Sequence, residues 1–188
     1  MKAIRCVGSE VQVKEIPDPV TGPGQVKVRI LRSGISTGTE LFKLRNMAPG
    51  AEGGLGYMAS GVVAETRDEA SVLKEGDRVF VRCGHAEYGV RDAIDVFPLP
   101  DGVDFNAAAA SYWIVPPMRG IHRLQPQVWD DVAVVGQGAI GLMGLQMLRH
   151  MARKLIAVDV NPFRLKASKA LGADVCVNTL EQDAVEAV

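Results

Sequence analysis

A glycine-rich segment at 136–141 has the residue types and spacing that point most directly to chemistry. It lies between a short apolar run, Val132–Val135, and a helical pattern, and it reads Gly136-Gln137-Gly138-Ala139-Ile140-Gly141. In this context the G-x-G-x-x-G spacing predicts a dinucleotide-binding turn. Gly136 permits the tight turn, Gly138 lets a pyrophosphate approach the backbone, and Gly141 lets the helix pack closely on the strand. The first helix amides and the helix dipole then favour the phosphates.

An acidic residue decides which dinucleotide is expected. Asp159 ends the next apolar run, at roughly the 20-residue spacing of the group that binds the ribose hydroxyls. A carboxylate accepts hydrogen bonds from two hydroxyls but repels a 2′-phosphate, so the sequence predicts NAD rather than NADP. Arg164 is nearby and supports the NADP alternative, although it could instead flank the adenine. Three glycines could also form a tight turn without a ligand, but the strands, the helix and Asp159 together favour the nucleotide.

The turn is expected to be positioned by strands and helices that alternate along the chain. Continuous apolar runs predict strands at Val132–Val135 and Leu155–Val160, both buried on two faces, and a third strand at Val175–Val177. Helices are expected at Ala139–Met151 and Pro162–Leu171, with Gly172 ending the second. This βαβαβ order predicts a parallel sheet, the first half of a Rossmann domain, followed by the start of a helix at Glu181–Val188.

The first part of the chain has a different pattern. Short β-rich runs separated by glycine and proline turns predict strands at Lys2–Val7, Val11–Ile16, Val26–Leu31, Ser60–Glu65, Arg78–Arg82 and Ala86–Val90. Strands at this density favour a barrel or a sandwich. Helical pieces follow at Asn106–Ser111 and Met118–Leu124. We therefore expect a fold with an N-terminal all-β part at 1–124 and an α/β part at 125–188.

Composition narrows the class of protein. The formal net charge is −1, from 21 basic and 22 acidic residues, and no basic run is present, which argues against nucleic-acid binding. No apolar stretch approaches the roughly 20 residues of a membrane span. The three cysteines form no C-x-x-C pair, and we expect reduced, mostly buried thiols. Without a visible signal peptide, the prediction is a cytoplasmic enzyme with a small-molecule substrate.

Several segments, in order, resemble the medium-chain dehydrogenase/reductase family, which joins a GroES-like barrel to a Rossmann domain. The resemblance covers essentially the whole chain. Ser33-Gly34-Ile35 followed by Thr39-Glu40-Leu41 resembles the family's active-site loop. The other matching segments are Gly56–Val63, Gly76-Asp77-Arg78-Val79, His85-Ala86-Glu87-Tyr88 and Pro98–Gly102. Gly34–Glu40 with Gly56-Tyr57 is most similar to the bacteriochlorophyllide dehydrogenase-like branch. The resemblance implies an oxidoreductase that moves hydride to or from a nicotinamide ring, homo-oligomeric when full-length.

The chain departs from the zinc-dependent members of that family. Ser36-Thr37 stand where those members have a cysteine, Tyr57-Met58 replace a His-Glu pair, and 110–115 contains no Cys, His or Glu. The cysteine-rich lobe of many members is also missing. Zinc requires thiolate, imidazole or carboxylate ligands. We therefore predict no catalytic zinc.

Other groups must then handle the proton. By resemblance, Thr39 matches a proton-relaying hydroxyl, or is simply a turn hydroxyl bonded to the backbone. Glu40 matches an acidic residue beside the metal, and without metal it could pair with an arginine or act as a weak base. Tyr57 is the favoured proton donor, or an aromatic that fills the metal position. Tyr112 and Trp113 are expected in the substrate cleft or in packing, and His85, His122 and His150 lack an evident partner.

Three functions compete. The leading prediction is an NAD-dependent, zinc-free oxidoreductase acting on an alcohol or carbonyl. The first alternative is an enoyl or quinone reductase, which would also lack zinc but would prefer NADPH. The second alternative is an incomplete, C-terminally truncated fragment that only binds nucleotide, because half of the expected nucleotide sheet is absent.

Overall fold

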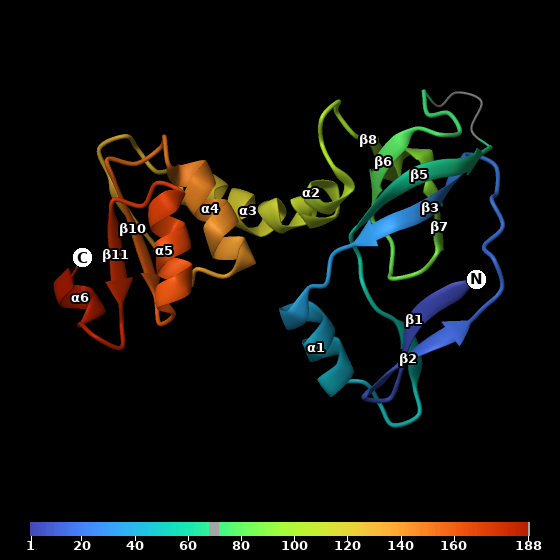
Figure 1. Ribbon diagram of the computed structural model, residues 1–188, viewed down its shortest axis with the longest axis horizontal. Helices are drawn as coiled ribbons and strands as arrows, with labels where there is room; N and C mark the ends of the chain where they lie inside the picture. The colour runs from blue at the N-terminus through green and yellow to red at the C-terminus, as the bar shows by residue number, and fades with distance from the viewer. Residues whose placement is uncertain (68–71, 188) are drawn as a thin grey trace. The chain divides into compact units, whose positions relative to one another are not determined.

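The computed structural model describes residues 1–67 and 72–187, which form two compact units, Met1–Tyr112 and Trp113–Val188 (Figure 1). This division falls earlier than the expected domain boundary at 124/125, because helix α3 (Val115–Leu124) packs within the second unit. Ile121 of α3 contacts the second unit's core, and Pro117 lies against Gly144. The boundary at 124/125 remains a prediction about the domains.

Two antiparallel sheets make up the first unit. The smaller has the order β2-β1-β4 and consists of β1 (Lys2–Val7), β2 (Glu10–Glu15) and β4 (Glu52–Gly54). The larger has the order β7-β3-β5-β6-β8 and consists of β3 (Gln25–Ser33), β5 (Ala59–Thr66), β6 (Arg78–Val81), β7 (Tyr88–Asp92) and β8 (Val96–Pro98). An antiparallel bridge between Ala3 and Ala86 joins the two. The predicted GroES-like β-barrel part is confirmed.

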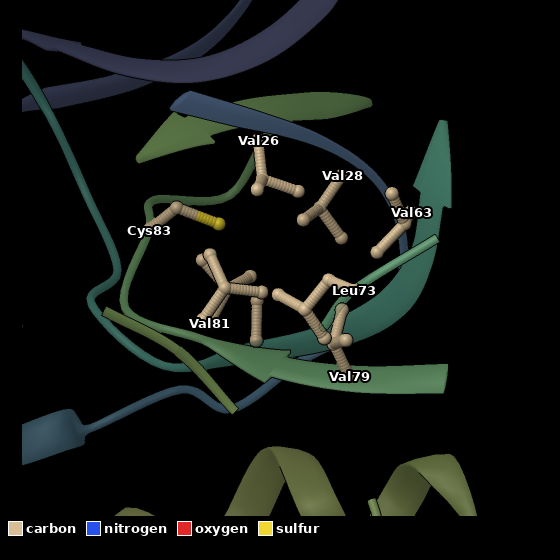
Figure 2. Packing of buried hydrophobic residues seen from close by; sticks show 9 residues of the cluster. Val26, Val28, Val63, Leu73, Val79, Val81 and Cys83 are labelled. Carbon is tan, nitrogen blue, oxygen red and sulfur yellow. The ribbon is translucent and has the colours of Figure 1, made fainter. Parts of the chain in front are cut away.

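The barrel core consists of alternate residues from neighbouring strands, as the period of two in a strand requires. Val26 and Val28 from β3 face Val79 and Val81 from β6, and Val63, Leu73 and Cys83 belong to the same cluster (Figure 2). Gly61 in β5 allows the strands to approach, because a Cβ there would lie 2.0 Å from the carbonyl oxygen of Arg29.

The segment expected to be an active-site loop contains a helix, α1 (Thr37–Arg45). Its N-cap residue, Ser36, makes no side-chain capping bond; instead, Glu40 turns back and accepts the N–H of Ser36 at 2.7 Å. Helix α2 (Phe105–Ala110) has Asp104 as its N-cap residue, whose carboxylate accepts the amides of Asn106 and Ala107. These bonds hold the pKa of Asp104 below its ordinary value. Single-turn 3-10 segments follow β7 at Ala93–Asp95 and α2 at Ser111–Ile114.

The second unit is a parallel sheet with the order β11-β10-β9, which confirms the predicted first half of a Rossmann domain. Its strands are β9 (Asp131–Val135), β10 (Lys154–Asp159) and β11 (Val175–Asn178). Helices α4 (Ala139–Leu148) and α5 (Pro162–Ala170) connect them, and the short α6 (Ala184–Ala187) follows. Leu155 and Ala157 of β10 pack with Leu145 and Leu165 of the two long helices.

The expectation that both early strands are buried on two faces is right for β10 and wrong for β9. Residues 155–159 of β10 are all buried, whereas Val135 of β9 is 80% exposed and Ala133 is also exposed. The reason is position: β10 is central, and β9 is an edge strand in the described sheet. Continuous hydrophobicity therefore predicts the strand itself but not the coverage of its second face.

All three cysteines are free thiols, and each belongs to a different sheet or its core. Cys6 is in β1, Cys83 is in the barrel core, and Cys176 is in β11. Burial raises the pKa of the Cys83 thiol to about 11, although Arg91 opposes this. Within residues 1–67 and 72–187, no helix is long and apolar enough to cross a membrane.

Candidate functional site: the nucleotide turn and a histidine–glutamate pair

The glycine turn has the geometry that its spacing predicts. Gly136 has a φ of +87°, a conformation that favours glycine, and its N–H donates to the carbonyl of Val158 at 2.8 Å. A Cβ at Gly141 would lie 1.8 Å from the carbonyl oxygen of Gly136, so the helix can approach the strand only with glycine there. A Cβ at Gly138 would meet nothing within 4 Å. The space above Gly138 is therefore open, and it lies where α4 begins with its unpaired first amides.

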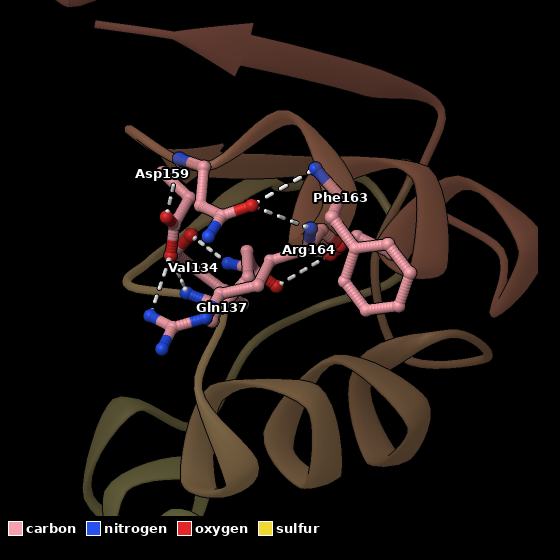
Figure 3. Close-up of polar contacts among 7 residues, drawn as sticks. Val134, Gln137, Asp159, Phe163 and Arg164 are labelled. Carbon is pink, nitrogen blue, oxygen red and sulfur yellow. Dashed lines mark hydrogen bonds and ion pairs between the residues drawn. The ribbon is translucent and has the colours of Figure 1, made fainter.

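Asp159 is fixed beside this turn by backbone amides (Figure 3). Its Oδ2 accepts the N–H of Gln137 at 2.5 Å, and its Oδ1 accepts the N–H of Asn161 at 2.8 Å. Burial alone would raise the pKa of Asp159, but these two bonds and nearby Arg164 outweigh burial and lower it. The carboxylate is thus ionised at neutral pH and held at the end of β10.

Gln137 belongs to the motif, but its side chain is directed into the protein (Figure 3). It is fully buried; its Nε2 donates to the Val134 carbonyl at 2.6 Å and its Oε1 accepts from Ser168 at 3.0 Å. Among the motif residues, Ala139 and Ile140 are exposed at the start of α4. Gln137 therefore anchors the turn to α5. The backbone that a ligand can approach begins at Gly138.

Arg164 lies in the first turn of α5, where the Asn161 side chain caps the amides of Phe163 and Arg164. Its guanidinium NH1 is 3.9 Å from Oδ2 of Asp159. The Arg164 side chain is 52% exposed and that of Asp159 is 5% exposed. Sequence spacing placed the two as neighbours, and the structure brings them together as a loose ion pair.

A second cluster is one that the sequence did not predict. His85 connects two residues that lie far away in the chain: its Nδ1 is 2.8 Å from Ser33 Oγ, and its Nε2 is 2.9 Å from Glu40 Oε2. The His85 and Glu40 side chains are 9% and 10% exposed. The expectation that no histidine has a partner is wrong for His85, because the pairing of β-strands brings positions 33 and 85 together. For Glu40, the observed partner is this histidine and not an arginine.

A cavity of about 450 Å³ opens beside this cluster. The polar part of its lining consists of Ser33, Thr37, Glu40 and His85, and aliphatic side chains such as Ile4, Leu44 and Leu55 contribute the rest. A nucleophile or hydroxyl, an imidazole and a carboxylate at hydrogen-bond distances can pass or hold a proton. The cluster is therefore the best-defined acid–base group that the described part of the first unit contains.

The remaining predicted residues fall in two places. Thr39 is exposed, and its Oγ1 accepts from Ser36 Oγ at 3.3 Å. Tyr57 meets Tyr112 edge to face, with ring centroids 5.6 Å apart, so the structure brings these two predicted residues together. Trp113 is half-buried and makes none of the ring contacts described for residues 1–67 and 72–187. Arg82, which the sequence did not single out, lies 5.1 Å from the Tyr112 ring centroid.

The donor atoms at the family's metal positions do not suit zinc. Ser36 offers a hydroxyl already engaged with Thr39, and Tyr57 offers a phenol packed on Tyr112. Zinc sites in proteins use thiolate, imidazole or carboxylate ligands, usually three or four together. The described residues contain no group of three or more His, Cys, Asp and Glu side chains that could hold a metal ion. We therefore derive no step through a metal.

The barrel of the first unit, together with the parallel sheet and glycine turn of the second, defines the class of protein. The class is that of alcohol dehydrogenase-like proteins, which have a GroES-like part and a Rossmann domain, here its first half. Residues 22–126 match the model of the alcohol dehydrogenase GroES-like domain, and residues 139–188 match that of zinc-binding dehydrogenases. The chain belongs to the medium-chain dehydrogenase/reductase family, in its zinc-type alcohol dehydrogenase-like group.

Individual relatives extend beyond this chain. It is 29% identical to an alcohol dehydrogenase of Rhizobium meliloti (strain 1021), with 98% of the chain matching 64% of that protein. It is 26% identical to a sorbitol dehydrogenase of Bacillus subtilis (strain 168), with 95% matching 61%. Galactitol-1-phosphate dehydrogenase from Escherichia coli shares the fold, with a TM-score of 0.85 and 23% identity over 99% of this chain and 63% of that one. The chain thus spans less than two thirds of these relatives.

Proposed function

We propose that the protein is an NAD-dependent oxidoreductase that transfers a hydride between the nicotinamide and an alcohol or carbonyl substrate, without catalytic zinc. The observation that carries this proposal is the glycine turn, open at Gly138 and flanked by the ionised carboxylate of Asp159. The bound nicotinamide would supply the hydride acceptor or donor. The names of the relatives, which include alcohol, sorbitol and L-threonine dehydrogenases, support a small hydroxyl-bearing substrate.

The preference for NAD rests on the charge beside the turn. Two backbone amides hold the Asp159 carboxylate in place, and its lowered pKa keeps it negative. A ribose diol can donate to such a group, whereas a 2′-phosphate would be repelled. Arg164 has the opposite effect, but its guanidinium is half-exposed and only loosely paired with Asp159. The fixed, ionised group is expected to dominate.

The proton is proposed to pass through residues of the first unit. Oxidation of an alcohol releases a hydride from carbon and a proton from oxygen, and the proton needs an acceptor. Glu40 paired with His85 is a suitable acceptor, because the two form a hydrogen-bonded pair that opens to a cavity. Tyr57 and Thr39 are the proposed hydroxyls next to the substrate. Tyr112 and Trp113 are proposed to line the substrate cleft.

Two further parts of the proposal concern metal and location. Metal analysis of the purified chain is expected to find no stoichiometric zinc, and finding it would contradict the zinc-free mechanism. The three free thiols suit a reducing compartment, so the cytoplasm is the proposed location.

Nucleotide titration of matched glycine variants tests the proposed cofactor. Gly138→Ala should fold normally, because the new Cβ meets nothing within 4 Å and the φ of −77° suits alanine. It should nevertheless weaken NADH binding by at least about tenfold, because the methyl group fills the space reserved for pyrophosphate. Nicotinamide fluorescence measures the affinity. Gly120→Ala in α3, where a Cβ also meets nothing, is the control and should bind as the wild type does.

The same titration separates the alternatives. Tighter binding of NADPH than NADH would contradict the Asp159 argument and favour an enoyl or quinone reductase, the function for which Arg164 is suited. If wild type and Gly138→Ala bind NADH equally well, Gly138 does not lie at a pyrophosphate-binding site. If the wild type binds neither nucleotide, the proposed NAD-dependent function is refuted.

A further inference from the structure

Arg82 is a cation held in place without an acidic partner. It follows β6, and its guanidinium lies over the Tyr112 ring at 5.1 Å from the centroid. That ring is fixed in turn by Phe80, which stacks on it at 6.2 Å and an interplanar angle of 9°. Among the described residues, no carboxylate oxygen lies within 4.0 Å of the Arg82 guanidinium.

Arg91 in β7 is a second such cation. Its Nε donates to the carbonyl of Arg82 at 2.7 Å, and its NH1 donates to the carbonyl of Val90 at 2.7 Å. Two of its five N–H donors are therefore used to fix the guanidinium, and three remain. Across residues 1–67 and 72–187, Arg91 likewise has no ion-pair partner.

The two arginines line one cavity of about 310 Å³, together with Tyr57. Gly56, Cys83 and Asp95 complete its lining. Asp95 is the acidic group there and brings one negative charge against two positive ones, while Cys83 is a neutral thiol because burial raises its pKa to about 11. The cavity thus has a net positive charge and holds guanidinium N–H groups for which the described residues supply no acceptor.

We propose that this cavity binds the oxyanion of the substrate, a carboxylate or a phosphate, so that the enzyme acts on an anionic alcohol or carbonyl compound. Guanidinium groups bind carboxylate and phosphate through charge-assisted and often bidentate hydrogen bonds. Tyr57 lines the same cavity, so a bound oxyanion brings its attached carbinol or carbonyl carbon to the phenol that is the proposed proton donor. The assignment of the oxyanion to a substrate rests on the proposed oxidoreductase function; the binding itself does not.

The test measures anion binding to the full chain without nucleotide. Isotope-labelled protein is titrated with glycolate, inorganic phosphate and neutral ethylene glycol at constant ionic strength, and the Arg side-chain Nε–H and Tyr57 ring resonances are followed by NMR. We expect saturable shifts at Arg82, Arg91 and Tyr57 with glycolate or phosphate and none with ethylene glycol. Binding of glycolate alone identifies a carboxylate site, and binding of phosphate alone identifies a phosphate site.

Matched charge variants make the result specific. Arg82→Gln should weaken anion binding by about tenfold or more, because it removes a charge-assisted bond. Arg29→Gln removes the same charge from an exposed arginine of β3 that does not line the cavity, and it should bind as the wild type does. Absence of saturable binding, or equal weakening in both variants, overturns the proposal. Because NADH binding is measured separately, a chain that binds NADH but no anion refutes this inference and leaves the proposed function standing.

Discussion

At the scale of single residues, Glu40 joins the start of α1 to His85. One carboxylate oxygen accepts the amide of Ser36 at the start of α1, and the other lies 2.9 Å from His85 Nε2. The side chain is buried, so both bonds are made away from water. A buried carboxylate that loses its partner or its charge leaves unsatisfied groups behind.

Glu40→Gln is therefore expected to destabilise the first unit by about 1–3 kcal/mol, the range for a buried hydrogen-bonding group left imperfectly paired. All three tyrosines lie in that unit, whereas both tryptophans lie in the second. Urea unfolding followed by tyrosine ring NMR should show the loss, and tryptophan fluorescence should show an unchanged second unit. Glu75→Gln at an exposed position is the control. An unchanged tyrosine transition in Glu40→Gln would show that the pair contributes no stability.

The two clusters differ in how far sequence could predict them. The glycine turn is local: its spacing, the flanking strands and Asp159 follow one another within about one βαβ unit. The contact of His85 with Ser33 and Glu40 joins segments that only sheet register brings together. The His85 ring also needs the space that glycine leaves at position 56, because a Cβ there would lie 2.7 Å from the ring. Nothing in the spacing of these residues indicates such a contact.

At the scale of elements, strands were predicted where apolar and polar residues alternate or where apolar residues run together. Strands β4 and β8, of three residues each, are too short to show such a pattern. Helix α1 was missed because its segment was assigned by resemblance to a loop, although Glu40 and Lys43 suit the first and last turns of a helix. Pattern thus predicts long elements, and tertiary pairing decides the short ones.

The junction of β10 with the nucleotide turn should make the second unit sensitive to acid. Because the folded-state pKa of Asp159 is below its ordinary value, the unfolded chain binds the proton more readily. The stability from Asp159 is therefore present above the ordinary pKa of 3.8 and is lost as pH falls through the folded pKa. Urea midpoints followed by tryptophan fluorescence should fall more steeply below about pH 4 in wild type than in Asp159→Asn. Parallel curves for the two proteins would contradict this role.

At the scale of the whole molecule, each unit has its own buried core, one of barrel strands and one between the parallel sheet and its helices. The change of pattern along the chain predicted this two-part organisation. The sequence could not show that α3 belongs with the second core, because its contacts through Ile121 and Pro117 are tertiary.

The three free thiols lie in different parts of the molecule. Cys6 is buried in β1, Cys83 is buried in the barrel core after β6, and Cys176 is partly buried in β11 of the second unit. Alkylating reagents attack the thiolate, and the pKa of Cys83, near 11, leaves it almost wholly protonated in the closed barrel. Burial and this raised pKa therefore slow the modification of Cys83 in the folded barrel. The rates at which Cys6 and Cys83 are alkylated therefore report how often the sheet or core around each of them opens.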